Sequence, residues 1–179
     1  MTARRARIYD VFALLVALIV VGFDQWTKAL VVAHLSPPET KAPIPLVGQY
    51  LVVYYIQNRG AAFGLFENSA LLIVLILIAV CVIAFLYIRM LNSGPIIYKL
   101  VFGMIIGGAS GNLIDRISHS GYVVDFISFR IPEINYYFAI FNIADACISV
   151  GVFLLFFLII FGGLPRREQQ QESSASNKA

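Results

Sequence analysis

The sequence predicts an all-α polytopic membrane protein with four transmembrane helices and a small β-structured region on the outer membrane surface. Of the 179 residues, 60% are hydrophobic and only 13% are charged, whereas about a quarter of the residues in a soluble domain carry charge. Four long apolar runs predict the helices. The net charge of +3 is too small and too scattered to indicate a nucleic-acid partner.

The four predicted helices cover about residues 11–33, 70–90, 96–116 and 139–161. Each approaches the roughly 20 residues that a helix needs to cross the hydrocarbon core of a bilayer. The RRAR segment before the first run is also typical of a secretory signal, but three further spans favour an uncleaved first helix. We therefore expect one membrane-embedded domain, residues 1–164, and a disordered cytoplasmic tail, residues 165–179.

Basic residues predict the orientation. Four crossings place both termini on one side, together with eight of the 13 Lys and Arg residues. Because basic residues are enriched on the cytoplasmic side of a membrane, we expect both termini in the cytoplasm.

The two predicted outer loops, residues 34–69 and 117–138, contain strand-like segments. YLVVYYIQ (50–57) and GYVVDFISFRI (121–131) are rich in β-branched and aromatic residues, which predicts two strands. The SPPETKAPIP segment between helix and strand is proline-rich, so it should be extended and free of helix.

Several polar residues interrupt the apolar runs, and each group has a structural explanation when taken alone. Asp24 and Lys28 are four residues apart, so they share a helix face and can form an ion pair. In NRGAAFG, Asn58 and Gly60 indicate a turn. A small-residue stripe, Gly103, Gly107 and Gly111, is typical of tight helix packing.

The next group, Asn112, Asp115 and Arg116, lies on one helix face, which favours a local Asp–Arg pair. Two further aspartates are harder to explain structurally. Asp125 is flanked by apolar residues in VVDFI, and no basic residue follows Asp145 until Arg166. Asn142, Asp145 and Ser149 are spaced about one turn apart on the fourth predicted helix.

Seven of these polar residues map to the outer half of the predicted topology, which indicates a functional cluster: Asp24, Asn58, Asn112, Arg116, Asp125, Asn142 and Asp145. Two carboxyl groups held close together cannot both ionise, so they share a proton. One can then activate water while the other donates a hydrogen bond to a peptide carbonyl, as in aspartic proteases. We expect no metal, because His34 and His119 lack the HExxH spacing, and no cofactor. Cys81 and Cys147 are interpreted as small hydrophobic residues.

Two other function classes compete with a protease. Buried carboxylates also form the proton relays of transporters, although a transporter favours charges at several depths or broken helices at the midplane. A non-enzymatic membrane scaffold would explain the glycine stripe, but it would explain neither Asp125 nor Asp145.

Five segments resemble one family, the bacterial lipoprotein signal peptidases, also called signal peptidase II. They are DQWTK (24–28), NRGAAFG (58–64), GNLIDR (111–116), VVDFI (123–127) and FNIAD (141–145), and they occur in the family's order with fitting spacing. The resemblance covers about residues 10–160. It implies four transmembrane helices with a β-structured cradle on the outer face of the bacterial cytoplasmic membrane.

The resemblance also implies an activity and its residues. The family's catalytic pair matches Asp125 and Asp145, and the supporting or substrate-binding positions match Asp24, Lys28, Asn58, Gly60, Asn112, Asp115, Arg116 and Asn142. The implied substrate is a prolipoprotein that carries a diacylglyceryl-cysteine, which is cleaved just before that cysteine. Membrane lipids and the inhibitor globomycin are the other implied partners, and we expect a monomer.

Overall fold

The computed structural model describes residues 3–60, residues 95–162 and five helical positions between them: Val74, Ile78, Cys81, Ile83 and Phe85. The rest of the predicted second helix (70–90) and the tail (165–179) lie outside the described residues. The described helices are α1 (Ala3–Leu35), α3 (Ile96–Ser118) and α4 (Ile143–Gly162). The strands are β1 (Ile44–Val47), β2 (Leu51–Asn58), β3 (Val123–Ile131) and β4 (Tyr136–Tyr137).

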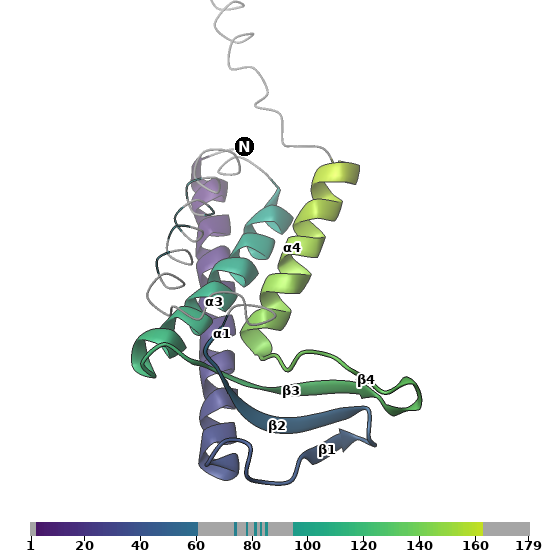
Figure 1. The fold of residues 1–179 in the computed structure, drawn as a ribbon. Coiled ribbons are helices and arrows are strands. Elements are labelled where there is room, and N and C mark those ends of the chain that lie inside the picture. The colour runs from purple at the N-terminus through teal and green to yellow at the C-terminus, as the bar shows by residue number, and fades with distance from the viewer. Residues whose placement is uncertain are drawn as a thin grey trace, which may run out of the picture.

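Three helices in the described part of the chain are long and apolar enough to cross a membrane: Arg7–Leu35, Ile96–Ser118 and Ile143–Phe161. α3 is central, because half of its most apolar window is buried, against 17% for α1 and 11% for α4. The start of α1 and the end of α4 lie at the same end of the bundle, opposite the sheet (Figure 1). This arrangement agrees with the expected common side for both termini.

Glycines bring the helices of the bundle close together. A Cβ atom on Gly103 would lie 2.5 Å from the Ala13 carbonyl oxygen, and one on Gly107 would lie 2.8 Å from that of Ala17. These distances are too short for any real side chain, so the α1–α3 contact depends on small residues. The structure thus confirms the packing role predicted for the glycine stripe.

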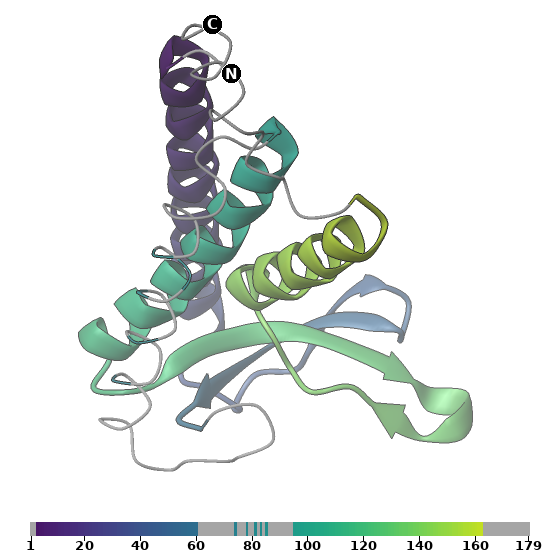
Figure 2. The same ribbon diagram turned by 90° about the horizontal axis from the view of Figure 1, so that it is seen from above.

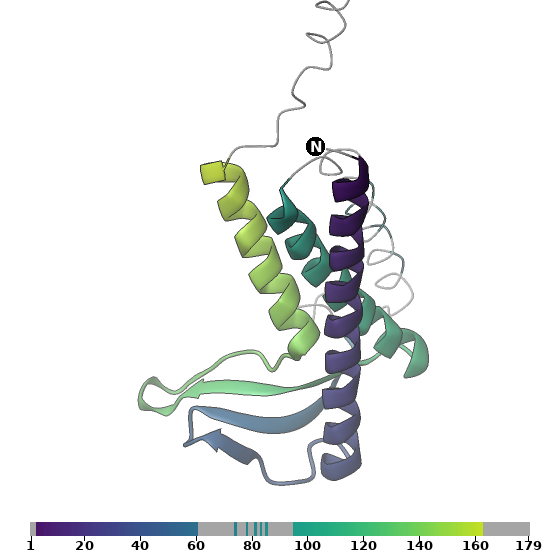
Figure 3. The ribbon, with the colours of Figure 1, turned by 180° about the vertical axis from the view of Figure 1, so that it is seen from behind.

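The strands form one antiparallel sheet of order β1-β2-β3-β4 at the end of the bundle. Figures 1 and 3 show that the sheet lies across the ends of the helices and projects sideways beyond α4. Seen from above, the β3–β4 hairpin reaches furthest from the helices (Figure 2). The two predicted strands are confirmed as β2 and β3, whereas β1 and β4 were not predicted.

The sheet is attached to the bundle through the end of α1. Val31 and Leu35 of α1 pack with Tyr55 of β2 and with Val124 and Phe126 of β3 in one buried cluster. β3 is buried from Val123 to Phe126, so its polar residue in this stretch, Asp125, lies inside the protein.

Two predicted helix boundaries are wrong. α1 begins at Ala3 rather than at about residue 11, so the helix also includes the basic and polar residues before Val11. α4 begins at Ile143 rather than at residue 139, and residues 139–142 form a non-helical approach to it. The sequence pattern predicted that Asn142 lies on the face of this helix. In the structure Asn142 precedes the helix instead.

Candidate active site

A cavity of about 340 Å³ lies where α3, α4, β2 and β3 meet. Polar side chains form one part of its wall, and apolar ones form the rest. The polar lining residues are Asn58, Asn112, Arg116, Asp125, Asp145 and Ser149, and the apolar ones are Val123, Phe138, Ile140, Phe141 and Ile148, together with Gly60 and Ala139. Such a concave, mostly apolar site with a few convergent polar groups is typical of a ligand-binding or active site.

Asp125 reaches the cavity from β3 and is 1% exposed. Its carboxylate accepts two hydrogen bonds, from Asn58 Nδ2 at 2.8 Å and from Asn142 Nδ2 at 2.6 Å. Burial, and after it the nearby charge of Asp145, raises the pKa of Asp125 from 3.8 to about 7. A carboxyl group with this pKa can gain or lose a proton near neutral pH.

Asp145 reaches the same cavity from the first turn of α4. Asn112 Nδ2 donates to its Oδ1 at 2.7 Å, and the Asn142 main-chain N–H donates to its Oδ2 at 3.2 Å. In return, Asn142 Oδ1 accepts the Asp145 main-chain N–H at 2.9 Å. This reciprocal pair is a capping box, with Asn142 at the N-cap of α4, and it explains why the helix begins after Asn142.

Each of the three asparagines is oriented by a second contact of its own amide oxygen. Asn58 Oδ1 accepts the Gly60 N–H at 3.0 Å, so its nitrogen faces Asp125. Asn112 Oδ1 accepts from Lys28 Nζ at 3.0 Å, so its nitrogen faces Asp145. Both aspartates therefore receive amide N–H donors whose direction is determined by other contacts.

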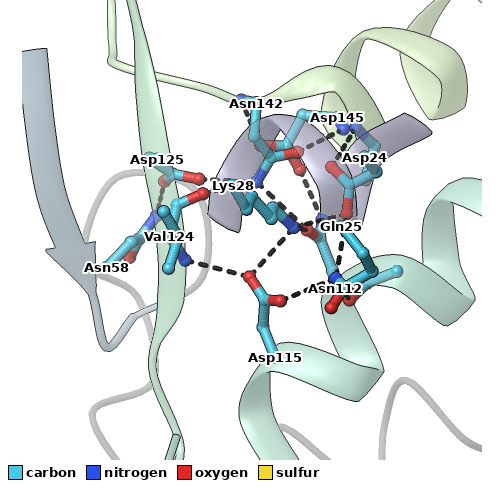
Figure 4. Close-up of polar contacts among 12 residues, drawn as sticks. Asp24, Gln25, Lys28, Asn58, Asn112, Asp115, Val124, Asp125, Asn142 and Asp145 are labelled. Carbon is cyan, nitrogen blue, oxygen red and sulfur yellow. Dashed lines mark hydrogen bonds and ion pairs between the residues drawn. The ribbon is translucent and has the colours of Figure 1, made fainter. Parts of the chain in front are cut away.

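Lys28 lies behind the cavity in a buried cluster with two carboxylates (Figure 4). Its Nζ lies 2.7 Å from Asp24 Oδ2, which confirms the predicted pair, and 2.9 Å from Asp115 Oδ2. The expectation of a local ion pair between Asp115 and Arg116 is wrong, because Asp115 pairs with Lys28. Asp115 contacts Lys28 across helices, since the packing of α1 on α3 brings the two side chains together.

Arg116 connects the two loops beside the cavity. Its Nη1 donates to the Gly121 carbonyl oxygen at 2.9 Å, and its Nη2 donates to that of Gly60 at 3.0 Å. A guanidinium group in this position holds the end of β2 against the start of β3. Every predicted site residue thus lies in the cavity wall or in the polar cluster directly behind it.

The sequence interpretation assigned no role to Gln25. Its Nε2 donates to Asp115 Oδ1 at 2.8 Å and to the Gly111 carbonyl oxygen and Asp24 Oδ2, both at 3.2 Å. The amide therefore completes the cluster around Lys28. Its signals in the sequence were its position next to Asp24 and its place in the DQWTK segment (24–28).

The family model described as Signal peptidase (SPase) II matches residues 16–161. The chain belongs to the signal peptidase II family. A lipoprotein signal peptidase of Anoxybacillus flavithermus is 41% identical over 142 residues, which are 79% of this chain and 81% of that protein. One of Caldanaerobacter subterraneus subsp. tengcongensis is 38% identical over 147 residues, or 82% and 94% of the two chains.

A solved structure agrees with this family. A bacterial membrane enzyme determined by the in meso method at 2.3 Å resolution superposes with a TM-score of 0.74 and 28% identity, over 88% of this chain and 93% of that one. Membership of the signal peptidase II family makes the chain a peptidase. Together with the three apolar helices in the described part of the chain, it also makes the chain an integral membrane protein of bacteria.

Proposed function

We propose that this signal peptidase II family member is an aspartic endopeptidase that removes signal peptides from diacylglyceryl-modified prolipoproteins. It cleaves just before the lipidated cysteine, and Asp125 and Asp145 activate the water. The observation that carries the proposal is that both carboxyl groups line one cavity and are held there by oriented asparagine donors.

The two aspartates divide the acid and base roles between them. With one proton on the pair, the ionised carboxylate takes a proton from water, and the water oxygen attacks the peptide carbonyl carbon. The protonated carboxyl group donates its hydrogen bond to the carbonyl oxygen and so stabilises the developing negative charge. The tetrahedral intermediate then collapses, and the proton taken from water passes to the leaving amine. General acid–base assistance of this type supplies about 10²–10⁴-fold in rate.

The elevated pKa of Asp125 supports its role as a group that gains and loses a proton near neutral pH. The Asn58 and Asn142 amides can donate to this carboxyl group in either protonation state, since a carboxyl group keeps acceptor capacity when it is protonated. The pair can therefore exchange its proton during turnover while the side chains stay in place.

The membrane sets the substrate class. We propose that both termini lie in the cytoplasm and that the sheet and the cavity lie near the outer face of the bacterial cytoplasmic membrane. A substrate with two acyl chains gains about 0.8 kcal/mol per CH₂ group removed from water, so a diacylglyceryl group would keep the scissile bond at the depth of the cavity. Membrane lipids are then the surroundings of both enzyme and substrate, and the enzyme works as a monomer without metal or cofactor.

A gel-shift assay tests this function. Purified protein is mixed with a diacylglyceryl-modified prolipoprotein, or with the same precursor before lipidation, in the presence or absence of globomycin. We expect cleavage of the lipidated precursor, poor cleavage of the unlipidated one, and inhibition by globomycin. Equal rates on the two precursors would contradict the proposed substrate class.

Two variants test the catalytic pair in the same assay. Asp125→Asn and Asp145→Asn keep the side-chain shape, but asparagine can neither accept a proton from water nor change its charge. We expect each variant to insert and bind substrate but to lose cleavage, whereas Glu133→Gln, in an exposed part of the sheet region, keeps it. Near wild-type turnover by either asparagine variant would show that the catalytic assignment is wrong.

A further inference from the structure

Lys28 contacts three oxygen atoms that belong to three different side chains. Its ammonium nitrogen lies 2.7 Å from Asp24 Oδ2, 2.9 Å from Asp115 Oδ2 and 3.0 Å from Asn112 Oδ1. Because an ammonium group has three N–H donors, these contacts use all of them. Lys28 is 3% exposed and does not belong to the described lining of the cavity, so it does not touch a substrate bound there.

Each of the two carboxylates also accepts an N–H from the main chain beside one candidate catalytic residue. Asp115 Oδ2 accepts the N–H of Val124, directly before Asp125, at 3.0 Å. Asp24 Oδ1 accepts the N–H of Ala144, directly before Asp145, at 3.0 Å. Hydrogen bonds to a charged acceptor are stronger than neutral ones, so each carboxylate holds the main chain next to one aspartate.

The third contact of Lys28 acts on a side chain rather than on the main chain. Since Asn112 Oδ1 faces Lys28, Asn112 Nδ2 is directed to Asp145 Oδ1 at 2.7 Å. Figure 4 shows Lys28 between these groups, with Asp115 and Val124 on one side and Asp24 and Asn112 on the other.

We propose that Lys28 is the positioning residue of the catalytic pair, which holds Asp125 through Asp115 and Asp145 through Asp24 and Asn112. One ammonium group on α1 thereby connects β3 and the start of α4, the two elements that carry the aspartates. The proposal rests on the proposed function only in taking Asp125 and Asp145 as the reacting groups. Its structural part, the hold on two main-chain N–H groups, is independent of that function.

Lys99 provides a matched control at the other end of the same two helices. It is fully buried on α3 and forms an ion pair with Asp10 of α1 at 2.5 Å. Loss of Lys28 or of Lys99 therefore removes a buried lysine from the α1–α3 contact, but only Lys28 is connected to the candidate catalytic residues.

The first test measures amide hydrogen exchange in the full-length protein in detergent, for Lys28→Met and Lys99→Met beside the wild type. We expect Lys28→Met to accelerate exchange of the Val124 and Ala144 N–H groups relative to the other amides of β3 and α4. Lys99→Met should not change these two selectively. Wild-type exchange at both amides in a folded Lys28→Met protein would overturn the proposal, whether or not the protein cleaves a prolipoprotein.

The second test uses turnover of the lipidated precursor. Displacement of catalytic groups by about 1 Å costs about 10²-fold in rate, so we expect Lys28→Met to lower kcat by about this factor with little change in KM. Lys99→Met should keep kcat. An equal loss of kcat in both variants would assign Lys28 a general structural role and overturn the proposal. Absence of turnover in the wild type would instead contradict the proposed function.

A third readout is the pH profile of cleavage. The charged groups around the pair are Asp145 from α4, Arg116 and Asp115 from α3, and Lys28 and Asp24 from α1. Lys28 is a positive charge among them, so its removal should shift the alkaline limb of the profile to higher pH. A purely structural role would leave the limb in place, and an unchanged limb would contradict the proposal.

Asp115→Leu keeps the proposal falsifiable if Lys28→Met does not fold, because it leaves Lys28 paired with Asp24. This variant removes the acceptor of the Val124 N–H, together with the Asp115 contacts of Lys28 and Gln25, and leaves Asp24 as the acceptor of the Ala144 N–H. We expect faster exchange at Val124 and unchanged exchange at Ala144. Equal effects at both amides, or no effect at Val124, would overturn the proposal.

Discussion

Asn142 donates a 2.6 Å hydrogen bond from its side-chain amide to Asp125, a residue 17 positions earlier in the chain. The same asparagine caps α4 through its amide oxygen, so the start of the helix and the side chain of β3 are positioned by one residue. The relative position of the two candidate catalytic groups therefore depends on the helix cap and not only on the segment that connects β3 to α4.

The elevated pKa of Asp125 predicts a pH-dependent stability. Because the folded protein binds this proton more tightly than the unfolded chain, the stabilisation is complete below about pH 4 and is lost as the pH rises through about 7. Asp125→Asn lacks this titration. The unfolding free energy of the variant, relative to the wild type, should therefore increase by roughly 3–5 kcal/mol from pH 4 to above pH 7.

Thermal unfolding in detergent across this pH range measures the difference between the two proteins. Glu133→Gln gives a comparison variant: the hydrogen bond from Tyr50 lowers the pKa of the Glu133 carboxyl group, so loss of this group should change the trend only at acid pH and not near pH 7. Parallel pH dependences for the wild type and Asp125→Asn would show that the Asp125 carboxyl group does not carry the elevated pKa.

Asp24→Asn should lower stability and yield while some turnover remains. The substitution removes one of two negative charges beside Lys28, but Asp115 still pairs with the ammonium group, and the asparagine oxygen can still accept the Ala144 N–H. We expect a loss of about 1–3 kcal/mol in the free energy of unfolding in detergent. Complete loss of cleavage by well-folded Asp24→Asn protein would assign Asp24 a direct catalytic role instead.

Gly107→Ala should separate α1 from α3 and destabilise the protein. The added Cβ would lie 2.8 Å from the Ala17 carbonyl oxygen and 2.9 Å from Val20 Cβ, and such overpacking costs about 1–3 kcal/mol. Gly22→Ala is the matched control, because its Cβ would meet no atom within 4 Å. Thermal unfolding of the two variants should differ, and equal melting temperatures would show that the contact adapts without cost.

Reporter fusions test the proposed orientation of the chain. A reporter placed after Arg166 should behave as cytoplasmic, and one placed in the segment 36–45, at the sheet end of α1, should behave as external. Activity of a compartment-specific reporter enzyme in intact cells is the measurement. The opposite pattern would move the sheet and the cavity to the cytoplasmic face and contradict the proposed access of the substrate.

Local patterns in the sequence predicted the helices and the two long strands well. Apolar length identified α1, α3 and α4, and β-branched residues identified β2 and β3. The start of α4 was missed because residues 139–141 are as apolar as the helix itself, although Asn142 and Asp145 have the spacing of a capping box. β4 was missed because it has only two residues, and β1 because Pro43 and Pro45 favour a loop.

The candidate site was only partly predictable for a different reason. The pair of Asp24 and Lys28 is local on one helix, so its spacing was sufficient evidence. The partner of Asp115 lies 87 positions away on α1, and a neighbouring arginine in the sequence gave the wrong expectation. Gln25 belongs to the site only because α1 and α3 pack closely, which no spacing within one helix can reveal.

The two hydrogen bonds from main-chain N–H groups to Asp24 and Asp115 have a consequence for how the site can vary. Every amino acid except proline supplies a main-chain N–H, so these anchors place no chemical demand on the side chains at positions 124 and 144. Both side chains are fully buried, and their size is limited by packing alone. Positions 124 and 144 can therefore accept different small apolar residues without displacing the neighbouring aspartates.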